Sequence, residues 1–149
     1  MKHLIKTAVL ASTLAFTVPQ AAQAQDEYPL TGAEWIEITG IDIHDGAGYK
    51  YATHLADAWR KNMDYSVEQG WIESYEIWSN THARKGEPDL WLITRFDQFA
   101  TNAEYEERGR KVRAMMQRTI TQLNSESGNR AEYRTILGDV LAKRLVWRD

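Results

Sequence analysis

Histidine is the side chain best suited to acid–base chemistry near neutral pH, and three histidines lie beyond residue 24. His54 follows Tyr51 by three residues, so it borders the apolar stripe of an expected helix and could face a cavity as a general base. The alternative is a boundary histidine that hydrogen-bonds at the surface. Asp42 and His44 share one face of an expected strand, but two such ligands without a third predict a polar strand exit rather than a metal site. His82 lies in a polar loop and is expected to be solvated.

Large aromatic side chains are the other candidates for a site, because flat rings line pockets for flat apolar ligands. All six tryptophans and all seven tyrosines follow residue 24, and most of them are expected to pack in a core. Tyr51 and Trp59 on the expected helix, with Trp91 on an expected strand, are the pocket candidates. The predicted ligand is therefore a small apolar or aromatic molecule.

Motifs that would name a reaction are absent from the sequence: it has no nucleophile elbow, phosphate-binding loop, dinucleotide fingerprint or HExxH. No cofactor is predicted. The charge-rich run 104–113 is interpreted as the solvated side of a helix with ion pairs four residues apart.

The N-terminus has the pattern of a secretory signal peptide. Lys2 and Lys6 precede an apolar run over 7–18, and Ala22 and Ala24 fit the −3 and −1 positions of a cleavage site. The run is too short for a membrane anchor, which needs about 20 residues. We therefore expect a signal peptide over 1–24, a single domain over 25–149 and a periplasmic or secreted protein.

The net charge limits the classes of molecule that the domain is expected to bind, and the cysteine content limits how its fold is stabilised. The whole chain has a net charge of −3, and losing the two signal-peptide lysines takes the mature domain to −5. An acidic domain without a basic cluster is not expected to bind nucleic acid or anionic lipid. With no cysteine, its core must hold the fold without disulfides.

Hydrophobic periodicity predicts an α+β domain of βαββαβ order, the ferredoxin-like arrangement of a four-stranded antiparallel sheet with two main helices. Gly70 and Gly138 are expected to end helices, and 125–129 to form a break. The expected strands are 34–43, 71–79, 89–96 and 140–147, and the expected helices are 49–69, 98–123 and a short one over 129–137.

Both faces of the expected sheet carry large apolar side chains. On the strand over 34–43, Trp35 and Ile41 alternate with Ile36 and Ile38. Two helices cover only one face of a four-stranded sheet, and an uncovered face should be polar. We therefore expect a homodimer in which a second sheet covers it.

Charged residues interrupt these apolar rows, and a buried charge needs a partner. If the rows share one face, Glu37, Glu73, Arg95 and Arg144 neutralise one another. The specific prediction is that Glu37 contacts Arg95 or Arg144, and the alternative is that these side chains reach water at strand ends.

The element order, length and apolar second face resemble those of the dimeric α/β-barrel superfamily, including its small signal-bearing bacterial members. The resemblance covers roughly 34–147 and implies a ligand held between helix and sheet. The superfamily includes cofactor-free monooxygenases, lactone isomerases, haem-dependent enzymes and stress proteins, so membership alone fixes no function.

Two functions follow as expectations. The first is an exported protein that binds a small molecule. The resemblance implies that, if it is catalytic, it performs a cofactor-independent oxidation or isomerisation of an aromatic compound, with His54 as the base and Tyr51 or Arg95 orienting an oxyanion. Haem on His54 is a minor variant. The second is a non-enzymatic envelope or stress protein whose aromatic residues are structural.

Overall fold

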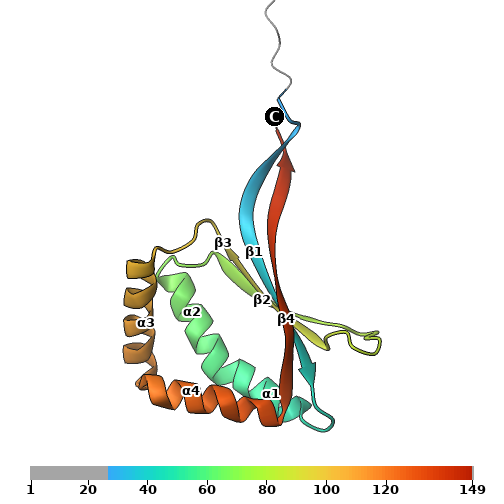
Figure 1. The fold of residues 1–149 in the computed structure, drawn as a ribbon, viewed down its shortest axis with the longest axis vertical. Helices are drawn as coiled ribbons and strands as arrows, with labels where there is room; N and C mark the ends of the chain where they lie inside the picture. Colours follow the sequence, from blue (N-terminus) through green and yellow to red (C-terminus); the bar gives the residue numbers. More distant parts are fainter. Residues whose placement is uncertain (1–26, 149) are drawn as a thin grey trace, which may run out of the picture.

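The computed structural model describes residues 27–148 and shows a four-stranded antiparallel sheet with helices, in the strand order β2-β3-β1-β4 (Figure 1). This confirms the predicted α+β, ferredoxin-like class. The expected signal peptide lies outside the described residues. The elements are β1 (Leu30–Ile43), α1 (Gly48–His54), η1 (Leu55–Trp59), α2 (Arg60–Glu68), β2 (Ser74–Ser79), β3 (Leu90–Phe96), α3 (Asn102–Met116), α4 (Ile120–Asn129), η2 (Arg130–Glu132) and β4 (Arg134–Trp147).

The pairing register divides the sheet into two faces. Ile41 on β1 lies opposite Leu90 on β3, and Thr39 lies opposite Leu92. Because side chains alternate along a strand, these residues form the face that packs against the helices, which we call the helical face. The other face carries the intervening residues, Ile36, Ile38, Trp91, Ile93 and Arg95 among them.

The core lies between the first face and the helical segment 48–68. Tyr51 and Leu55 from this segment are buried against Ile41 and Tyr133. In Figure 1 α2, α3 and α4 lie on the same side of β1 and β4, and α1 lies at the lower end of these two strands. No helix of the described residues covers the second face, which we call the open face.

The expected helix over 98–123 is two helices. Gln117 ends α3 in the left-handed conformation at φ 53°. The side chains of Thr119 and Gln122 then form a capping box that starts α4 in a new direction. The expected break at 125–129 instead lies inside α4, where all of these residues except Glu126 are exposed.

β4 begins at Arg134, although a short helix was predicted over 129–137. That prediction is wrong because pairing with β1 decides the conformation: Thr135 lies opposite Asp42, and Ile136 opposite Ile41. Gly138, expected to end the helix, instead lies opposite Gly40 beside a bulge, with φ at +152°. A glycine is favoured there because other residues rarely adopt that φ.

The ion pairs on the open face differ from the prediction. Glu37 lies opposite Thr94 on the helical face, and the Thr94 hydroxyl donates a hydrogen bond to it at 3.5 Å. It therefore contacts neither Arg95 nor Arg144, and that prediction is wrong. Glu34 takes its place: its Oε1 lies 2.6 Å from Arg144 Nε and 3.8 Å from Arg95 Nη1.

Register explains the exchange. Arg95 lies opposite Ile36, so its row on β1 contains the even-numbered residues and includes Glu34 rather than Glu37. Arg95 is also paired with Glu76 on β2, Nε to Oε1, at 3.1 Å. The hydrogen bond from Arg144 is the main reason that the pKa of Glu34 lies below its usual value.

We expect the Glu34–Arg144 pair to stabilise the fold more than an exposed pair does, because the Glu34 side chain is only 13% exposed and serves two arginines. Glu34→Gln, Arg144→Gln and the double variant, compared by urea unfolding, should show a coupling energy clearly above zero. The matched control is the exposed pair Glu27–Arg148 at 3.2 Å. Equal coupling in the two cycles would contradict this prediction.

None of the helices in the described residues is long and apolar enough to cross a membrane.

Candidate functional site

The predicted site residues of the first helix lie around its junction with η1. Tyr51 is buried in the core between β1 and Tyr133. The His54 ring stacks on the Tyr51 ring, with centroids 6.0 Å apart and planes 24° apart. Trp59 follows one turn later and meets the Tyr75 ring edge to face at 5.2 Å. These three predicted residues are therefore brought together.

Trp91 and Arg95 are not part of this group. Both occupy the open face of β3, where Trp91 borders a shallow hollow with Ile38, Pro88 and Val140, and Arg95 pairs with Glu34 and Glu76. Their predicted place between helix and sheet is wrong because the helix-facing row of β3 consists of the even-numbered residues. Arg95 therefore cannot orient an oxyanion beside His54.

A cavity of about 230 Å³ lies between the helical segment 48–68 and the pair α3–α4, and we call it the interhelical cavity. One wall comes from the first segment, where three of the four residues are spaced by four, as one helix face requires. The opposite wall comes from α3, α4 and the first residue of η2, at spacings of three or four residues within α3 and from α4 into η2. The lining residues are His54, Ala58, Trp59, Asn62, Val112, Met116, Leu123, Glu126 and Arg130.

The turn η1 has π-helical geometry and interrupts an otherwise α-helical segment. Single π turns often occur at functional sites, because the wider turn changes the direction of the side chains around it. Here His54 immediately precedes the turn and Trp59 ends it. The irregular turn therefore lies where the segment faces both the core and the interhelical cavity.

Two arginines, Arg130 and Arg134, place positive charge near His54. Burial lowers the pKa of His54 below its usual value, and Arg130 and Arg134 lower it further, so the imidazole is neutral at pH 7. Burial and then Arg134 also lower the pKa of Arg130, but an arginine remains charged in proteins. Arg134 lies 5.9 Å from the centre of the Tyr51 ring.

Two polar atoms at this cavity lack hydrogen-bond partners within residues 27–148: Nε of Arg130 and Oδ1 of Asn62. A buried donor or acceptor without a partner is costly, so each marks a place where a ligand or water can add stability. Glu126, the carboxylate in the cavity wall, is held by Arg118 through Nε and Oε1 at 2.8 Å. It is thus already paired with a different arginine.

Sequence reasoning missed Asn62, Glu126 and Arg130. The spacing of Ala58 and Asn62 after His54 contained a usable signal, since steps of four residues keep one helix face. Arg130 could not be placed, because the end of α4 and the start of β4 were mispredicted.

A second cavity of about 440 Å³ lies between helix and sheet, where the ligand was expected. Its wall is largely apolar and includes Leu55, Trp59, Tyr75, Ile77 and Leu90. His54 does not line it. The two cavities share Trp59, and the polar groups are gathered in the interhelical one.

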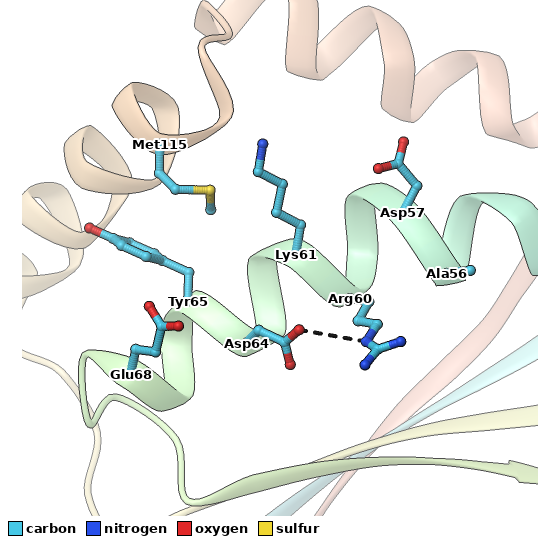
Figure 2. Close-up of a pocket in the computed structure, with 8 residues that line it drawn as sticks. All are labelled: Ala56, Asp57, Arg60, Lys61, Asp64, Tyr65, Glu68 and Met115. Carbon is cyan, nitrogen blue, oxygen red and sulfur yellow. Dashed lines mark ion pairs between the residues drawn. The ribbon is translucent and has the colours of Figure 1, made fainter.

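Figure 2 shows the groove of about 470 Å³ along the exposed side of α2. Lys61 and Asp57 point away from the sheet, while Arg60 and Asp64 form an ion pair at 3.6 Å (Figure 2). Charged side chains of both signs line this groove and can be solvated where they are. It offers no enclosed surface to a ligand.

No group of three or more potential metal-ligating side chains occurs among residues 27–148. His44 instead links the end of β1 to the start of β4. One of its ring nitrogens lies 3.1 Å from the carbonyl oxygen of Glu132, just before β4, and the other lies 3.0 Å from the Thr135 hydroxyl. This is the structural role that the sequence favoured for it.

Comparison with known proteins does not identify a family. No family model matches the chain, and no curated protein matches it. Among solved structures, the chain is similar to one titled "crystal structure of HapK from Hahella chejuensis", at 11% identity, covering 75% of this chain and 92% of that chain with a TM-score of 0.39.

Proposed function

We propose that this chain is an exported protein that binds a small aromatic molecule in the interhelical cavity. The observation that carries the proposal is the combination, around one cavity, of apolar walls with residues whose buried polar atoms lack partners. Binding sites for small molecules typically combine apolar walls with a few polar groups that fix orientation. Trp59, Met116 and Leu123 supply apolar surface, and His54, Asn62 and Arg130 supply the polar groups.

The volume limits the ligand to about one substituted ring. An apolar cavity of about 150 Å³ admits benzene, and the interhelical cavity measures about 230 Å³. The indole of Trp59 offers a flat surface to such a ring.

Catalysis by this site would use His54 as the base. A neutral imidazole can accept a proton from a phenol or an activated C–H group, and the lowered pKa of His54, caused mainly by burial, favours this neutral form. Arg130 would then have the role predicted for Arg95, which is to stabilise the negative charge that develops on the ligand. Isomerisation of an aromatic compound, or its cofactor-independent oxidation with dioxygen as the oxidant, would begin with this proton transfer.

A second copy of the chain is the partner we propose for the open face. Val140 and Trp78 are exposed on it beside the partly buried Ile36 and Ile38, and an exposed apolar sheet face favours association. The expected export to the periplasm or medium remains part of the proposal.

Leu123→Trp tests the location of the site. The indole would occupy part of the interhelical cavity, so we expect binding of a one-ring ligand to weaken about tenfold or more. Calorimetric titration with benzoate, benzamide, benzamidine and phenol supplies the measurement. Ile77→Trp, which fills the cavity between helix and sheet, is the matched control and should leave binding unchanged.

Loss of binding in Ile77→Trp alone would move the site to the cavity between helix and sheet. If no member of the panel binds the parent protein at millimolar concentration, the binding proposal is wrong and the non-enzymatic alternative takes its place.

A further inference from the structure

Building on this proposed function, we infer that the ligand of the interhelical cavity is an aromatic carboxylate that also carries a hydroxyl group, with Arg130 binding the carboxylate and Asn62 accepting from the hydroxyl. The inference concerns the chemical class of the ligand and rests on the charge balance of the cavity.

The cavity contains an arginine without an ion-pair partner. Arg130 lines the cavity and forms no salt bridge within residues 27–148. Glu126, the carboxylate in the same wall, is paired with Arg118 at 2.8 Å. An anion in the cavity would therefore balance the charge of Arg130.

The position of Arg130 suits an anion attached to an apolar group. Arginine presents a planar fork of donors that matches a carboxylate, and Arg130 lines the cavity with its Nε buried and unpartnered. The apolar wall formed by Trp59, Met116 and Leu123 faces the same space. A ligand that fits both needs an anionic group attached directly to an apolar ring.

Asn62 offers the ligand a second polar contact. Its Oδ1 is a buried acceptor without a donor, and it belongs to the same cavity wall as His54. A hydroxyl on the ring would supply the missing donor. The neutral imidazole of His54 adds a further acceptor and no additional charge, so the anion has to be balanced by the arginines.

The test uses three probes of equal shape and different charge: benzoate, benzamide and benzamidine. Calorimetric titration of the full chain should show benzoate binding about ten to a hundred times more tightly than benzamide, as a charged hydrogen bond allows. Arg130→Gln should remove that preference. Arg110→Gln on the exposed side of α3, where Arg110 pairs with Glu107 at 2.6 Å, should keep it.

Asn62→Leu, which has a similar shape, tests the hydroxyl. The parent protein should bind 3- or 4-hydroxybenzoate more tightly than benzoate, and the variant should bind them equally. Circular dichroism and thermal unfolding confirm that each variant is folded, and the selectivity of the parent protein decides the question even if a variant is not.

The outcomes separate the two proposals. If benzamide binds as tightly as benzoate and Leu123→Trp abolishes both, the binding function stands and the anionic class is wrong. If hydroxybenzoates gain nothing over benzoate, the role of Asn62 is wrong. If none of the probes binds, both the function and the ligand class are rejected.

Discussion

Replacing Tyr51 by alanine should lower the free energy of unfolding by about 3–5 kcal/mol, the range seen when a large buried aromatic side chain is removed. Tyr51 is 1% exposed and contacts the core cluster of Ile41, Leu55 and Tyr133. Its ring also supports His54, so any ligand site at His54 would be affected through the fold. Urea unfolding followed by circular dichroism gives the measurement.

Tyr49→Ala is the matched control. Tyr49 lies two residues earlier on the same helix and is 88% exposed, so its loss should change stability by no more than about 0.5 kcal/mol. If the two variants are equally stable, the core cluster is not where the fold gains its stability.

Val140→Lys should convert the expected dimer into a monomer. Val140 lies on the open face and is 58% exposed, so a second sheet packed there would have to bury the new charge. Light scattering should give twice the mass of one chain for the parent protein and the mass of one chain for the variant.

Leu141→Lys is the control, because Leu141 is the next residue on β4, is 52% exposed and lies on the helical face opposite Glu37. This variant should remain dimeric if the copies join sheet to sheet through the open face. Dissociation by Leu141→Lys alone would place the interface on the other face, and a parent protein that is monomeric at micromolar concentration would reject the dimer.

Local pattern was sufficient for the class and order of most of the fold. The helical stripe through Tyr51, Leu55 and Trp59, ended by Gly70, predicted α1–α2 within a residue at either end, and β-branched alternation placed β1 and β3. Element identity there depends on neighbours in sequence, which a single sequence shows.

Tertiary pairing decided the rest. The segment 134–139 has no strong helical or strand pattern of its own, and it becomes strand because β1 offers hydrogen-bonding partners along Asp42 to Thr39. The partners of charged residues could not be predicted for the same reason. Whether Arg95 contacts Glu34 or Glu37 depends on the register between strands that are distant in sequence, and a shift of one residue exchanges the two faces of a strand.

Only part of the site could be predicted from the sequence, and the reason is the same. His54 does line a cavity, as its place beside the apolar stripe suggested, but the opposite wall comes from α3, α4 and η2 rather than from the sheet. Trp91 and Arg95 were assigned to the wrong face because the sequence showed two alternating rows on β3 without showing which row the helices cover.

The π turn at Leu55–Trp59 also sets the rotational phase of α2, the helix that continues from it. In an α-helix each residue advances the side chains by about 100° around the axis, whereas the wider π turn accommodates one extra residue. Deleting one residue from Leu55–Trp59 would therefore let the turn close as regular α-helix and leave Asn62 and the later positions of α2 in phase with His54, while the same deletion elsewhere in the segment would rotate them. Among homologous chains, a length difference of one residue at this point is therefore compatible with an unchanged cavity wall.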